Sequence, residues 1–121
     1  MSYARATNSL TTVFTAISET TTSEIYCNKF SKEVFDEIQL HIVIVGTGTW
    51  NVNIQGAFES NDIFVDNYIG CEGNIFRNST GNITSGMIIC FKCLPPHFKI
   101  VATEIDGIST LTLKYELISK S

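Results

Sequence analysis

Cysteine and histidine are the residue types in this chain that metal or redox chemistry would use. Cys90 and Cys93 have the spacing of a zinc knuckle or a redox pair, and His97 follows closely. On a continuous strand, however, side chains three positions apart point to opposite faces of the sheet. The other two cysteines, Cys27 and Cys71, do not form a second close pair. We therefore predict thiols that behave as small hydrophobic side chains, with Cys90, Cys93 and His97 as the candidate zinc ligands.

Nucleophilic catalysis needs a serine or cysteine held next to a histidine and an acid. The sequence contains no local nucleophile signature such as G-x-S-x-G. His41 falls on the polar side of an alternating stretch, and His97 follows two prolines, which favours a surface position for each. We predict no catalytic residue, no cofactor and no enzymatic activity.

The region after residue 58 combines acidic and aromatic side chains. Its acids could bind calcium together with loop carbonyls, but they lack the D-x-D-x-D-G spacing, so a solvated loop is the preferred interpretation. Phe64, Tyr68 and Trp50 could form a sugar-binding platform. Trp50 is in phase with Val52 and Ile54, which predicts a core position instead. The acids are Glu59, Asp62, Asp66 and Glu72.

The composition of the 121 residues favours a single domain with a weakly charged surface. Charged residues make up 17%, below the usual quarter, and threonine, serine and asparagine replace them. The net charge is -4 and no basic cluster occurs, so we predict no nucleic-acid partner. The apolar runs are short, which predicts no membrane span, and the start of the chain does not resemble a signal peptide. We expect assembly in a reducing cytoplasm.

The stretch from Phe35 to Phe58 alternates between apolar and polar residues and predicts two strands. The run Gly46-Thr47-Gly48-Thr49 divides it, so we predict a β-hairpin with Trp50, Val52, Ile54 and Phe58 on the apolar face. Gly56 indicates a bulge or a close backbone approach. The cluster Glu59-Ser60-Asn61-Asp62 predicts a turn.

The second half of the chain predicts further strands. Residues 87–91 and 98–103 alternate or are strongly apolar, with a proline break between them, and 62–69 could form a weak strand. Asp106-Gly107 predicts a second tight hairpin, followed by a strand over 109–118 with Leu111, Leu113, Tyr115 and Leu117 facing inward. With about seven or eight strands, an all-β fold with a single antiparallel β-sandwich, jelly-roll or immunoglobulin-like, is the natural way to bury these faces. We assign residues 23–121 to this domain.

Residues 1–22 carry little charge and show no sustained periodicity. We interpret them as an extended arm that crosses a neighbouring subunit by adding a strand to its sheet edge. A first strand of the sandwich, preceded by a loose tail, is an equal alternative. In the arm interpretation, removal of residues 1–18 leaves the domain folded, and the residues that contact the partner are Tyr3, Arg5, Leu10, Val13 and Phe14.

Taken together, the order of elements resembles a small β-sandwich common among virion proteins of tailed bacteriophages. The resemblance covers nearly the whole chain, but each of its pieces is a loose motif. Cys93 departs from it, because such chains more often have a small residue at this corner. The pieces are the Thr/Ser/Ala-rich leader, the strand TWNVNIQGAFES, the proline-containing GMIICFKCLPPHFKIVAT and the terminal EIDGISTLTLKYE.

Members of this group are capsid decoration proteins, head-fibre components or tail accessory modules. The resemblance implies a structural, auxiliary virion protein that binds the capsid lattice through its arm and sheet edges, with other virion proteins as partners and a homo-oligomeric or lattice-bound state. A tail or head-fibre module is the first alternative. A carbohydrate-binding module that contacts the host surface is the second. The group shares a fold and no active site, so the resemblance supplies no catalytic residue.

Overall fold

The computed structural model describes residues 3–5, 10–30, 33–35, 37–65, 78–92 and 94–120. The regular secondary structure of these residues is all β-strand, and none of them is helical. The prediction of an all-β, antiparallel fold is therefore confirmed. The strands are β1 (Tyr3–Arg5), β2 (Thr11–Ile17), β3 (Thr21–Thr22), β4 (Tyr26–Cys27), β5 (Lys29–Phe30), β6 (Glu33–Val34), β7 (Glu37–Ala57), β8 (Ser79–Ile83), β9 (Met87–Lys92) and β10 (His97–Lys120).

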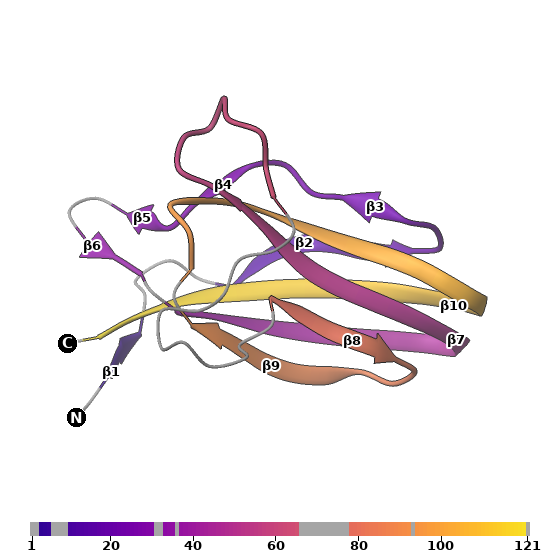
Figure 1. The fold of residues 1–121 in the computed structure, drawn as a ribbon. Coiled ribbons are helices and arrows are strands. Elements are labelled where there is room, and N and C mark those ends of the chain that lie inside the picture. The colour runs from indigo at the N-terminus through magenta and orange to yellow at the C-terminus, as the bar shows by residue number, and fades with distance from the viewer. Residues whose placement is uncertain are drawn as a thin grey trace.

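Two long antiparallel strands, β7 and β10, form the centre of the sheet. Their pairing runs from Glu37 opposite Ile118 to Ala57 opposite His97, with one irregularity between Glu104 and Asp106. Figure 1 shows that both strands turn back at the same end of the molecule, at the right of the view. Each strand therefore has two halves, and the hydrogen-bonded pairing continues through the corner between them.

The two predicted hairpins are wrong, and both glycine signals belong to this corner. Gly48 pairs with Gly107, and Thr49 pairs with Asp106, so the two glycine-containing stretches lie against each other. Gly46 and Gly107 have backbone φ angles of 105° and 87°. Residues that carry a Cβ atom rarely adopt such positive values. A positive φ angle serves a bend in a continuous strand as well as a hairpin turn, and the sequence alone did not distinguish them.

The remaining strands extend the sheet on either side of the central pair. On the first half of β7, β9 lies beside residues 37–42, and on its second half β8 lies beside residues 50–53. The strands β1 to β4 all pair with β10. One continuous sheet thus accounts for all the strands except β5 and β6, which pair with each other. The two separate sheets of a jelly-roll or immunoglobulin-like sandwich are not confirmed.

The hydrophobic core draws side chains from both halves of both long strands. The predicted inward set of β10 is buried, and Trp50 is fully buried as predicted, with its indole Nε1 donating to Ser109 Oγ at 2.8 Å. The hydrogen bond satisfies an indole N–H that would otherwise be costly to bury. The buried side chains of the two strands include Ile38, Leu40, Ile42, Trp50, Val52, Ile54, Phe98, Ile100, Ala102, Leu111, Leu113, Tyr115 and Leu117.

The described part of residues 1–22 belongs to this sheet, and a separate arm is not confirmed. β2 pairs with residues 111–115 of β10, and β3 pairs with Val101 and Ala102. Phe14 of β2 is only 4% exposed and is part of the core. The structure therefore corresponds to the alternative of a first strand, and removal of residues 1–18 would take Phe14 out of the core.

Candidate functional site

The loop that follows β7 is held in one shape by its own hydrogen bonds. The amide of Asp62 donates to the carbonyl of Glu59 at 3.1 Å, and the Glu59 amide donates to Asp62 Oδ2 at 3.2 Å. Gly56 and Val65 then exchange two backbone hydrogen bonds of 3.0 Å, which return the loop to the strand that it left. The turn predicted at residues 59–62 is confirmed.

Two prolines form the opposite wall beside this loop. A Cβ atom at Gly56 would overlap the ring of Pro95, so glycine allows the proline to lie directly on the strand. This confirms the close approach predicted at Gly56. The buried side chain of Asn28 donates to the Leu94 carbonyl at 3.1 Å, and its backbone amide donates to the Pro96 carbonyl at 3.1 Å. The proline corner is thereby anchored to the segment between β4 and β5.

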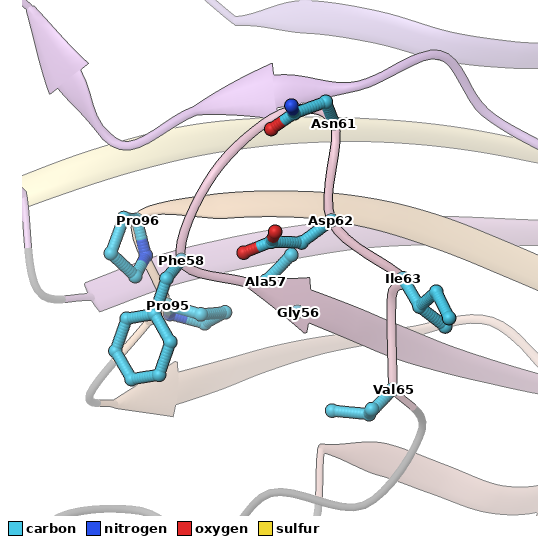
Figure 2. Close-up of a pocket in the computed structure, with 9 residues that line it drawn as sticks. All are labelled: Gly56, Ala57, Phe58, Asn61, Asp62, Ile63, Val65, Pro95 and Pro96. Carbon is cyan, nitrogen blue, oxygen red and sulfur yellow. The ribbon is translucent and has the colours of Figure 1, made fainter.

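Between the loop and the prolines lies a pocket of about 590 Å³ (Figure 2). Phe58 and Ile63 on its rim are 82% and 89% exposed, and Val65 is half exposed. Asp62 is the only ionisable residue among those that line the pocket. The lining residues are Gly56, Ala57, Phe58, Asn61, Asp62, Ile63, Val65, Pro95 and Pro96.

Two side chains of β10 contact the loop and stabilise its position. The ammonium of Lys99 lies 4.5 Å from the centre of the Phe64 ring, within the range of a cation–π interaction. His97 Nδ1 lies 3.1 Å from the carbonyl oxygen of Phe58, a distance that suits an Nδ1–H donor. The loop is therefore fixed at several points, while the Phe58 and Ile63 side chains stay open to solvent.

Phe58 lies on the surface, and its predicted position on the apolar face is wrong. We predicted that it continues the apolar face of Trp50, Val52 and Ile54, but β7 ends at Ala57 and the side chain is exposed. The turn cluster that begins at Glu59 is the signal that could have shown this, because a strand that stops no longer dictates the face of the next residue.

The candidate metal ligands do not form a site among the described residues. No group of three or more histidine, cysteine or acidic residues that could hold a metal occurs there. Cys90 is exposed on β9, where its Sγ accepts from Gln39 Nε2 at 3.5 Å, and His97 lies at the start of β10 beside the pocket. Cys93 and Cys71 lie outside the described residues, and Cys27 is exposed on β4.

The predicted partner-binding residues are spread over two strands and the segment between them. Tyr3 and Arg5 belong to β1, which pairs with the end of β10. Leu10 is exposed, Val13 packs partly against the core, and Phe14 is buried in it. The Phe14 side chain is therefore not on the surface, and of Leu10, Val13 and Phe14 only Leu10 presents a large exposed hydrophobic side chain.

The loop residues considered for calcium or sugars are only partly described. Glu59 and Asp62 share the turn of the pocket loop, whereas Asp66, Tyr68 and Glu72 lie outside the described residues. Trp50 is buried in the core, so its ring cannot contact a sugar. Phe64 has the Lys99 ammonium over its ring. Among the described residues of this site, Phe58 is the exposed ring, rather than Phe64 or Trp50.

A cluster of three aromatic rings lies where β4 meets β10. The ring centre of Tyr26 is 5.5 Å from that of Phe98 and 5.1 Å from that of Tyr115. Burial, with a smaller contribution from the Glu24 carboxylate, raises the pKa of Tyr26 from 10.0 to about 12. Burial also raises the pKa of Tyr115. Both phenols stay protonated at neutral pH and serve packing rather than acid–base chemistry.

Comparison with protein-family models, with curated proteins and with solved structures finds no match to this chain. Within the part of the chain that the structure describes, no helix is long and apolar enough to cross a membrane.

Proposed function

We propose that this chain is a non-catalytic binding module, an auxiliary structural component of a larger assembly, and that it docks through the rim of the pocket. The tailed-phage resemblance of the sequence supports a virion as that assembly. The observation that carries the proposal is the outward position of Phe58 and Ile63 on a loop that is otherwise tightly hydrogen-bonded.

Large apolar side chains that remain in water are costly, and a cluster of them is typical of a surface that a partner covers. Aromatic and aliphatic side chains of this kind supply most of the binding energy in protein interfaces. The loop is already ordered, so little conformational freedom is lost when a partner binds. Repeated sites on a lattice would further strengthen a modest affinity at each site.

Incorporation into particles tests this proposal. The full chain and the variant Phe58→Ser/Ile63→Ser are each produced with the virion proteins, and the copy number in purified particles is measured by mass spectrometry. We expect the variant to fold, since both side chains are exposed, and to be at least about tenfold depleted, which corresponds to about 1.4 kcal/mol of binding free energy.

The matched control is Ile108→Ser. Ile108 is also highly exposed but lies at the corner between the two halves of β10, opposite Thr47. The substitution therefore removes an aliphatic side chain from a different surface. We expect its incorporation to equal that of the wild type. Full incorporation of the Phe58/Ile63 variant would exclude the pocket rim as the docking surface, and absence of the wild type from particles would exclude the virion role.

A carbohydrate-binding module is the second candidate, and one observation favours it. The exposed Phe58 ring lies on the same pocket as the Asn61 amide and the Asp62 carboxylate. An aromatic face beside planar hydrogen-bonding groups is a common way to hold a sugar. Glycan-array binding that is lost in Phe58→Ala and kept in Ile108→Ser would support this candidate, and an array without signal would argue against it.

A further inference from the structure

The carboxylate of Asp62 is the one charge in a pocket with mostly apolar walls. It is fixed in place because its Oδ2 accepts the Glu59 amide hydrogen at 3.2 Å. Figure 2 shows the carboxylate directed across the loop toward the side of Phe58 and Pro96. A carboxylate has about four lone-pair sites, so this one bond leaves acceptor capacity for a ligand.

The chemistry of these walls selects among possible occupants. A purely apolar side chain would cover the carboxylate without replacing its water, which is unfavourable. An acidic one would be repelled, and Glu59 next to the pocket and the net charge of -4 add to that repulsion. A cationic group on an apolar stem satisfies both the carboxylate and the hydrophobic walls.

Among cationic groups, guanidinium fits the pocket best. Its plane can stack on an aromatic ring such as Phe58, and its fork of N–H donors can bind a carboxylate at two points. It is also less strongly hydrated than an ammonium, so it loses less on entering the pocket. A volume of about 590 Å³ accommodates such a side chain together with flanking residues of the segment that carries it.

We propose that this pocket binds an arginine side chain presented by an extended segment of a partner protein, with Asp62 accepting its N–H groups. The inference rests on the proposed function and specifies the chemistry of the partner. Phe58 and the two prolines contact the aliphatic part of the arginine side chain and the face of its guanidinium group. The Glu59–Asp62 turn keeps the carboxylate of Asp62 in position before the ligand binds.

Titration with short peptides tests the inference on the full chain, labelled with ¹⁵N and followed by NMR. The probes are acetyl-Gly-Arg-Gly-amide and the same peptide with citrulline, which keeps the shape of arginine but lacks the charge. We expect shifts centred on residues 56–63 and an affinity for the arginine peptide roughly fivefold higher, as for an ion pair that is partly open to water. The difference should shrink in high salt.

Two variants, each of which replaces one carboxylate by an uncharged amide, complete the design. Asp62→Asn keeps an oxygen to accept the Glu59 amide hydrogen, so the turn is preserved while the charge is removed; it should bind both peptides equally. Asp106→Asn removes an exposed carboxylate at the corner and should keep the preference for arginine.

Equal binding of the two peptides by the wild type would overturn the inference, and so would shifts away from the pocket or a preference that survives in Asp62→Asn. Such a result would leave the proposed function intact if the Phe58/Ile63 variant is still lost from particles. The two failures are thus distinguishable.

Discussion

At the scale of single residues, the pocket depends on Gly56. Its two backbone hydrogen bonds to Val65 close the loop, and the ring of Pro95 lies against its Cα. Any side chain at this position must displace the proline wall. The position of the Pro95 wall of the pocket therefore depends on the absence of a side chain at residue 56.

Gly56→Ala should destabilise the protein by about 1–3 kcal/mol, because the added methyl group overpacks the contact with Pro95. Urea unfolding of the variant measures this. The double variant Gly56→Ala/Pro95→Gly gives the coupling between the two positions, and we expect part of the loss to be recovered. Fully additive effects would contradict the proposed contact.

At the scale of elements, β2 contributes to the sheet through Phe14. Phe14 pairs with Leu113 and lies in the core, whereas Leu10 before the strand is 46% exposed. Residues of this segment thus divide between the core and the surface, a division that the sequence pattern did not show because no sustained periodicity occurs there.

Phe14→Ala should lower the free energy of unfolding by about 3–5 kcal/mol, the usual cost of removing a buried phenylalanine. Leu10→Ala, in the same segment, should change it by less than about 0.5 kcal/mol. Denaturant unfolding compares the two. A small effect of Phe14→Ala would show that β2 is an arm that leaves the sheet.

The aromatic cluster between β4 and β10 predicts a loss of stability in alkaline solution. Because the folded state raises the pKa of Tyr26 from 10.0 to about 12, folding favours the protonated phenol. This contribution is complete below pH 10 and is lost as the pH rises toward 12. The raised pKa of Tyr115 acts in the same direction.

Measured by denaturant unfolding at pH 9 to 12, the free energy of unfolding should fall more steeply with pH in the wild type than in Tyr26→Phe. The replacement removes the titrating hydroxyl and keeps the ring that packs on Phe98. Identical pH profiles would mean that Tyr26 ionises equally easily in the folded and unfolded states.

At the scale of the whole molecule, the alternation of residues predicted most of the core. Leu111, Leu113 and Tyr115 are buried as their spacing indicated, because a period of two assigns faces without reference to the partner strand. The pairing of strands was not predictable in this way. Gly46-Thr47-Gly48-Thr49 and Asp106-Gly107 have the same local chemistry in a hairpin and in a bent strand, and only their contact with each other decides the outcome.

The pocket could be predicted only in part. The turn at residues 59–62 and the close approach at Gly56 follow from local residue types. The Pro95–Pro96 corner lies against the loop because His97 pairs with Ala57. No local sequence pattern encodes this long-range register. The exposure of Phe58 follows from where β7 ends.

We propose that the rim of this pocket is the surface that a partner covers. Hydrogen exchange, followed by mass spectrometry on the free chain and on the chain bound in purified particles, tests it most directly. We predict slower exchange over residues 58–65 and the 94–97 corner on binding, with little change at the corner around Gly107. Protection confined to β9 or to the Gly107 corner, with the pocket loop unchanged, would contradict it.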